Sequence, residues 1–191
     1  MSHSEKRNHL CDANNSCLII IDIQGKLSAA IPEKVTNRLR NNTSILITAA
    51  NQLNIPIIAT AQYPKGLGPI EEFITTSLSD SARKFDKTCF SCLGAEGLSE
   101  YLTNLNKRQI ILLGIEAHIC VLQSAFELMA EGYEVFVVTD ATGSRKLSSY
   151  DIALSRMNQS CVNLLTTESV LFEWLRDATH PQFKSLSKLI V

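Results

Sequence analysis

Cys120 is the residue whose type and position most strongly suggest covalent chemistry. It follows the apolar run 109–114 and opens a helical pattern of apolar residues over 118–131. A cysteine at a helix N-terminus lies beside unpaired N–H groups and partial positive charge, which favour the thiolate and lower its pKa. The same N–H groups can hold an oxyanion formed by attack on a carbonyl. For a lone cysteine, a buried and inert thiol is the alternative interpretation.

Asp22 and Lys87 are two charged residues at positions where chemistry is possible. Asp22 ends the apolar run of IIID, where a carboxylate can act as a base or cap a following helix. Lys87 lies in ARKFDKTCFS, within a segment that we expect to be irregular and where lysines are usually solvated. Neither residue by itself establishes a catalytic role.

The other cysteines and the histidines give little indication of a metal or redox site. Cys89 and Cys92 have CxxC spacing, but no second pair or histidine partner accompanies them. The four histidines are scattered, and the cysteines form no disulfide framework, which is consistent with a reducing compartment. We therefore expect no metal and no cofactor.

The elements that must position these residues follow an alternating pattern. Short β-branched runs alternate with longer helical patterns, which is typical of βαβ units and a mainly parallel sheet. The expected strands are 17–23, 56–61, 109–114, 134–139 and 162–166, and the expected helices are 35–53, 96–106, 118–131, 150–159 and 169–176. Sheets of this kind have helices on both faces and bind ligands at the carboxyl ends of their strands.

The segment 62–93 departs from this alternation. It is rich in turn-forming residues, and only 70–78 has a helical pattern. A long connection inside a compact domain is usually functional or disordered.

Composition limits the classes of protein to which the chain can belong. Its 191 residues, 45% of them hydrophobic, are enough for one sizeable core. The formal net charge of −1 provides no field that would favour nucleic acid or an anionic membrane. The apolar runs are too short for a membrane span, and the first residues lack the apolar region of a signal peptide. We expect a cytoplasmic protein with a small-molecule partner.

Taken together, the motifs resemble those of a known superfamily. Asp22 and Gln24 form a D-x-Q motif after the first strand, KTCFS follows at 87–91, and GIEAHIC follows at 114–120. In this order they resemble the isochorismatase-like cysteine hydrolases, and within that superfamily the isochorismatase domain-containing proteins. The resemblance extends from about residue 16 to the end of the chain.

The resemblance implies a fold and a domain division. The expected fold is a single-domain, three-layer α/β/α structure that is Rossmann-like, with a six-stranded, mostly parallel sheet. We expect a hydrolase domain over 16–191 after a flexible N-terminal segment, 1–15.

The resemblance also implies a catalytic triad of Asp22, Lys87 and Cys120. Asp22 would take the proton from Cys120, Lys87 would hold the carboxylate and favour the thiolate, and the thiolate would attack a carbonyl carbon. The bond between Ile115 and Glu116 is expected to be cis, with the N–H groups of Glu116 and Cys120 as oxyanion donors. The reaction would be hydrolysis of a C–N bond of an amide, imide or carbamoyl type in a small molecule.

One departure from the superfamily bears on the substrate. Where its nicotinamidases carry an Asp and His metal cluster, this chain has TAQYP at 60–64, which disfavours a metal-assisted nicotinamidase. Position suggests substrate-binding roles for a group of residues near the strand ends. They are Gln24, Gln62, Tyr63, Phe90 and His118. We expect the side chain of Glu116 to point away, because in the pocket it would disfavour anionic substrates.

The same sequence is also compatible with a function other than catalysis, and it predicts an oligomer. The chain could be a binding or scaffold protein that kept the site without efficient turnover. A nucleic-acid role has neither a basic patch nor a stacking platform to support it. Apolar side chains in 126–129 and 183–191 suggest a surface buried between subunits, so we expect a homo-oligomer, a dimer or larger.

Overall fold

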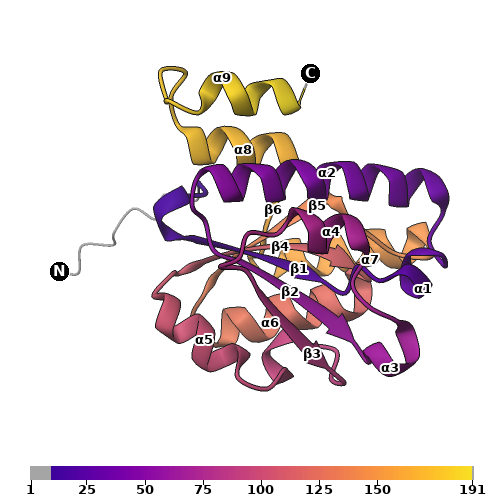
Figure 1. Cartoon of the computed structure of the whole chain (residues 1–191). Helices are drawn as coiled ribbons and strands as arrows, with labels where there is room; N and C mark the ends of the chain where they lie inside the picture. Colours follow the sequence, from indigo (N-terminus) through magenta and orange to yellow (C-terminus); the bar gives the residue numbers. More distant parts are fainter. Residues whose placement is uncertain (1–9, 191) are drawn as a thin grey trace.

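The central feature of the computed structural model, which describes residues 10–190, is a sheet of six parallel strands. The strands are β1 (Ser16–Ile21), β2 (Ile57–Gln62), β3 (Arg83–Lys87), β4 (Gln109–Ile115), β5 (Glu134–Gly143) and β6 (Asn163–Leu165). Their order in the sheet is β3-β2-β1-β4-β5-β6. The predicted three-layer α/β/α class is confirmed, and the sheet is parallel throughout (Figure 1).

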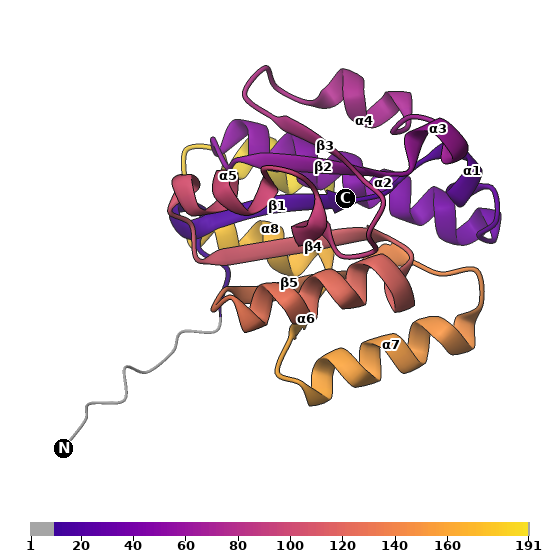
Figure 2. The same cartoon turned by 90° about the horizontal axis from the view of Figure 1, so that it is seen from below.

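Helices cover both faces of this sheet. They are α1 (Gly25–Ser28), α2 (Glu33–Gln52), α3 (Pro64–Leu67), α4 (Glu72–Ser77), α5 (Leu98–Leu105), α6 (Leu122–Ala130), α7 (Leu147–Gln159), α8 (Thr167–Leu175) and α9 (Phe183–Leu186). One face is covered by α2, α4 and α8, with α9 stacked outside α8 (Figure 1). The other face is covered by α5, α6 and α7 (Figure 2). Within residues 10–190, no helix has the length and apolarity to span a membrane.

The side chains of β1 explain why the sheet lies between two helical layers. Every residue of β1 is buried. Leu18 and Ile20 pack into the core shared with α2, α4 and α8, whereas Ile19 and Ile21 pack into the core shared with α5, α6 and α7. A strand that is apolar on both faces is stable only between two layers. Because β1 is parallel to its neighbours β2 and β4, the carboxyl ends of these strands lie at the same edge of the sheet.

The segment 62–93 is more regular than the sequence suggested. It contains α3, α4 and the edge strand β3, so Lys87 is the last residue of a strand and does not lie in an irregular loop. The five residues RKFDK of β3 include two that are exposed at its start, Arg83 and Lys84. A strand at the edge of a sheet is partly exposed and needs no continuous apolar run. For this reason the sequence pattern did not reveal β3.

The two ends of the described chain pack against the domain. Cys11 is fully buried and its N–H donates to Glu173, and Ala13–Asn15 forms a 3-10 turn. Residues 10–15 thus differ from the flexible segment expected there, whereas residues 1–9 lie outside the described part.

The apolar side chains that suggested a subunit interface pack against the cores of this chain. In the C-terminal tail, Leu186 is buried and Phe183 packs against the same core of this chain. Phe126 also packs against its own core. The large apolar side chains that are most exposed are instead Leu147 and Ile152 of α7, at 74% and 63%. Surface available to a partner is therefore found on α7.

Gly114 is a position where the close approach of two strands excludes a side chain. Its φ is +124°, and a Cβ there would collide with the carbonyl oxygen of Ile21 in β1. We expect Gly114→Ala to lower the free energy of unfolding by about 3 kcal/mol or more, because backbone strain adds to the collision. Urea denaturation measures this change.

Gly132 provides the matched control. Its φ is +88°, but nothing lies within 4 Å of the added Cβ, so Gly132→Ala has only the conformational cost of about 1–2 kcal/mol. Equal losses in the two variants would contradict a steric role for Gly114.

Candidate active site

A buried ion pair joins the carboxyl ends of β1 and β3. Lys87 Nζ lies 2.6 Å from Asp22 Oδ2, and both side chains are fully buried. Asp22 follows the last residue of β1 and Lys87 ends β3, with β2 between them. The structure thus brings together two of the residues that the sequence suggested for catalysis.

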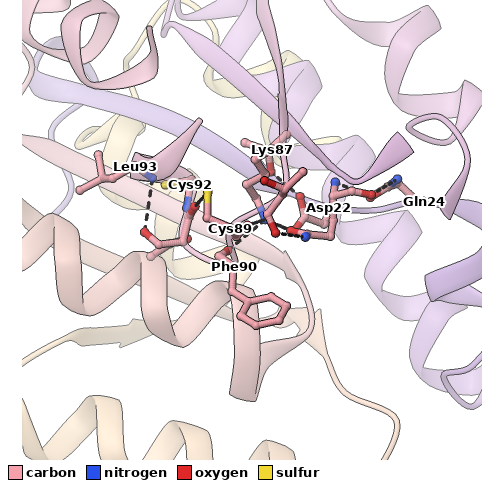
Figure 3. A network of polar contacts seen from close by, with 12 residues as sticks. Asp22, Gln24, Lys87, Cys89, Phe90, Cys92 and Leu93 are labelled. Atoms are coloured by element: carbon pink, nitrogen blue, oxygen red, sulfur yellow. Dashed lines mark hydrogen bonds and ion pairs between the residues drawn. The ribbon is translucent and has the colours of Figure 1, made fainter. Parts of the chain in front are cut away.

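The Lys87 ammonium group also donates hydrogen bonds to acceptors other than Asp22. Its Nζ donates to Gln62 Oε1 at 2.6 Å, to the carbonyl of Phe90 at 2.9 Å and to that of Cys89 at 3.3 Å. A buried ammonium is tolerated only with such complete pairing. Figure 3 shows Lys87 beside Asp22, with the Phe90 ring pointing away from this polar network.

Asp22 is fixed in place by its own contacts. Thr60 Oγ1 of β2 donates to Asp22 Oδ1 at 2.7 Å, while Lys87 binds the other oxygen. The backbone φ of Asp22 is +51°, a left-handed conformation that costs energy for a residue with a Cβ. Strain of this kind is frequent at functional sites.

Cys120 lies in a π-helical turn, Ala117–Val121, between β4 and α6. Burial, and after it the neighbouring Asp22 carboxylate, raise the pKa of its thiol to about 12, although Lys87 partly opposes the rise. This is opposite to the lowering that the sequence suggested. Cys120 is the fourth residue of the turn and not its first, so desolvation outweighs the helix N-terminus. The resting side chain at neutral pH is a thiol beside a carboxylate.

A cavity of about 190 Å³ opens beside Cys120. It is lined by Leu27, Ala30, Gln62, Leu67, Phe90, Glu116, Ile119, Cys120 and Arg145. Of the substrate-binding residues expected from position, Gln62 and Phe90 line this cavity. Tyr63 instead borders a neighbouring hollow that is also lined by Lys87 and Asp86.

Gln24 and His118 have polar partners in the protein. The side-chain amide of Gln24 donates to the carbonyls of Gln62 and Gly68 and accepts from the Gln62 N–H, so it fixes the end of β2. His118 Nδ1 lies 3.0 Å from Ser144 Oγ. Neither side chain is among those that line the cavity.

Glu116 lines the cavity, contrary to the expectation that it points away. Its Oε1 lies 2.5 Å from Arg145 Nε, and its Oε2 lies 3.3 Å from His118 Nδ1. The peptide bond between Ile115 and Glu116 is cis, as expected. No pattern in the sequence pointed to Arg145, because an arginine 25 residues after Cys120 has no characteristic spacing.

Other reactive groups in the described part of the chain are dispersed. Among residues 10–190, no group of three or more His, Cys, Asp or Glu side chains is placed to hold a metal ion. All six cysteines are free thiols.

The raised pKa of Cys120 leads to a test by alkylation. Between pH 7 and pH 10, we expect iodoacetamide to react with Cys120 at a rate that rises with pH without a plateau, because the pKa is about 12. Asp22→Asn removes a neighbouring negative charge but keeps Lys87, so the pKa falls. Alkylation at pH 8 should accelerate by about tenfold, since one pKa unit is tenfold in thiolate.

Peptide mapping measures each cysteine separately, and near-UV circular dichroism checks that the variant is folded. Cys161 is exposed and serves as the internal control, because its rate should not change. Rapid alkylation of wild-type Cys120 at neutral pH would contradict a buried resting thiol.

Comparison with known proteins places the chain in a family. The family model described as the isochorismatase domain matches residues 16–169. The isochorismatase domain-containing protein 2 of Xenopus laevis is 39% identical over 180 residues, which are 93% of this chain and 84% of the relative.

Two solved structures are similar over most of their length. The MAR1 ribonuclease of Caenorhabditis elegans has a TM-score of 0.88 and 35% identity, and the match covers 95% of this chain and 92% of that one. The YcaC gene product of Escherichia coli, described as an octameric hydrolase of unknown specificity, has a TM-score of 0.87 and 26% identity, with 95% and 89% covered. With its fold, its motifs and these matches in agreement, the chain belongs to the isochorismatase family and has the hydrolase fold of that family.

Proposed function

We propose that the chain is a cysteine hydrolase that cleaves a C–N bond of an amide, imide or carbamoyl type in a small molecule. The observation that supports this most is the fully buried pair of Asp22 and Lys87 at the carboxyl edge of the sheet, with Cys120 close enough for both charges to act on its pKa. A thiol, a base and a fixed cation at one cavity are the parts that nucleophilic attack on a carbonyl requires.

The first half of the reaction forms a thioester. Asp22 takes the proton from Cys120 while the sulfur attacks the carbonyl carbon, and the C=O electrons move to the oxygen. The N–H groups of Glu116 and Cys120 are the proposed donors to that oxyanion. The intermediate collapses, the C–N bond breaks, and the amine leaves with the proton that Asp22 held.

The second half returns the enzyme to its resting state. A water molecule loses a proton to Asp22 and attacks the thioester carbon. The C–S bond breaks, the acid product leaves, and the sulfur regains the proton from Asp22. Lys87 holds the Asp22 carboxylate in place through their ion pair and stabilises the negative charge that develops on sulfur.

The raised pKa of Cys120 determines how the proton is handled. The thiolate is a minor species at neutral pH, so attack must be accompanied by proton transfer to a base already in place. Asp22 fits this role because its two oxygens are held by Thr60 and Lys87.

We also propose that the chain forms a homo-oligomer. The exposed Leu147 and Ile152 on α7 and the octameric description of the Escherichia coli relative support this. A cytoplasmic location remains a prediction from the sequence.

The assembly is tested by sedimentation velocity. We expect the wild-type protein to sediment as a dimer or larger species, and the double variant Leu147→Asp/Ile152→Asp to shift toward monomer, because two charges would replace exposed apolar contacts. Wild-type protein that sediments only as a monomer would contradict the assembly.

Substitution of the nucleophile tests the proposed reaction. We expect Cys120→Ala to lower turnover of a responsive amide, imide or carbamoyl compound by about 10³-fold or more, with little change in melting temperature. Release of ammonia or amine from a panel of such compounds measures this. Cys161→Ala removes an exposed thiol and is the matched control.

Other outcomes of the same assays would contradict the proposed reaction. Full activity in Cys120→Ala would rule out the nucleophile. If no compound turns over while several raise the melting temperature, the chain is a binding protein that retains the fold. Cleavage of RNA by wild-type protein and by Cys120→Ala alike would favour a nuclease activity, as in the name of the Caenorhabditis elegans relative.

A further inference from the structure

Arg145 is a cavity residue to which the proposed reaction gives no role. It lies between the end of β5 and the start of α7, and it lines the same cavity as Cys120. Its side chain is 55% exposed, and its Nε is paired with Glu116 Oε1. Within residues 10–190, its two Nη groups have no partner in the protein. The outer edge of the guanidinium is thus open.

Glu116 fixes the orientation of this guanidinium. The Glu116 side chain is only 7% exposed, and Glu116 directly follows the buried strand β4, so it is a rigid anchor. A carboxylate bound at Nε leaves the two Nη groups as a planar pair of donors, the geometry that suits a second carboxylate. An arginine that is already oriented loses less entropy when a ligand binds.

The charges around the cavity balance before any ligand enters. Asp22 is paired with Lys87, and Glu116 is paired with Arg145. An anionic ligand therefore meets no net negative charge, although Glu116 taken alone would repel it. The partly solvated Arg145 is the cation whose donors remain available.

Apart from Gln62, the rest of the lining is apolar. Leu27, Ala30, Leu67, Phe90 and Ile119 make up this part of the wall. A ligand that fits such a cavity has an apolar middle, a carbonyl group near Cys120 and a polar group near Arg145.

We propose that Arg145 is the specificity residue of the cavity and that the substrate carries a carboxylate, which binds its Nη groups while Cys120 attacks the amide at the other end. This inference rests on the proposed function for the reaction at Cys120. Recognition of the carboxylate is a separate property, because binding can be measured when no bond is cleaved.

The test compares three ligands of equal length. They are 5-amino-5-oxopentanoate with a carboxylate, pentanediamide, which is neutral, and 5-aminopentanamide with an ammonium group. Their four-carbon homologues extend the comparison to a shorter span. Titration calorimetry on the Cys120→Ala protein gives the dissociation constants, because that variant leaves the ligands intact.

We expect the carboxylate ligand to bind about tenfold or more tightly than the neutral one at the better-fitting length. Adding Arg145→Met should abolish this difference, since Met keeps the apolar stem and removes the donors. Arg145→Lys should retain only part of it, because a single ammonium cannot make the paired contact. Lys146→Met is the matched control: it removes the neighbouring exposed charge and should leave the ratio unchanged.

Three results would overturn the proposal. They are equal binding of the neutral and anionic ligands, tightest binding of the ammonium ligand, and a preference for carboxylate that survives Arg145→Met. A wild-type protein that binds the carboxylate through Arg145 but cleaves no amide would contradict the proposed function and leave the recognition role of Arg145 intact. Circular dichroism of each variant confirms that it is folded.

Discussion

The buried ion pair between Lys87 and Asp22 ties together two strands that are not neighbours in the sheet. β2 lies between them, and it contributes Thr60 to the carboxylate and Gln62 to the ammonium. Removal of two charges from water is costly, and their attraction offsets that cost only when the remaining donors and acceptors are also paired. The polar residues at the ends of β1, β2 and β3 therefore form one unit, in which each member depends on the others.

This unit determines the chemical behaviour of Cys120, the proposed nucleophile. Cys120 comes from the other side of β1, after β4, and it is placed in a dry environment next to Asp22. Desolvation opposes ionisation of the thiol, and the neighbouring carboxylate opposes it further. The resting cysteine is therefore protected from unspecific alkylation or oxidation. In the proposed reaction, the same carboxylate accepts the proton of the thiol when a carbonyl group binds. Low reactivity at rest and a base in contact are two consequences of one arrangement.

The second ion pair at the cavity, Glu116 with Arg145, differs from the first in its exposure. Lys87 and Asp22 are sealed, whereas Arg145 is open to solvent and to whatever enters the cavity. In the proposed reaction, the buried pair acts on Cys120, and the exposed pair is the one proposed to recognise the ligand. Gln24 serves neither purpose directly, because its amide is used to hold the backbone at the ends of β2 and α3.

The amino-acid sequence was sufficient to predict the class of fold, most of the strands and the candidate residues Asp22, Lys87 and Cys120. Apolar runs such as that of β1 have a strong local signal, because a strand buried on both faces must be apolar throughout. The sequence did not reveal β3. This strand is mostly polar, and such a strand is stable only at the edge of the sheet, where it is partly exposed to water. The direction in which the pKa of Cys120 is shifted, and the orientation of Glu116 toward Arg145, became known only from the folded structure. Both depend on desolvation and on charges brought close from distant parts of the chain, and neither leaves a pattern in the local sequence.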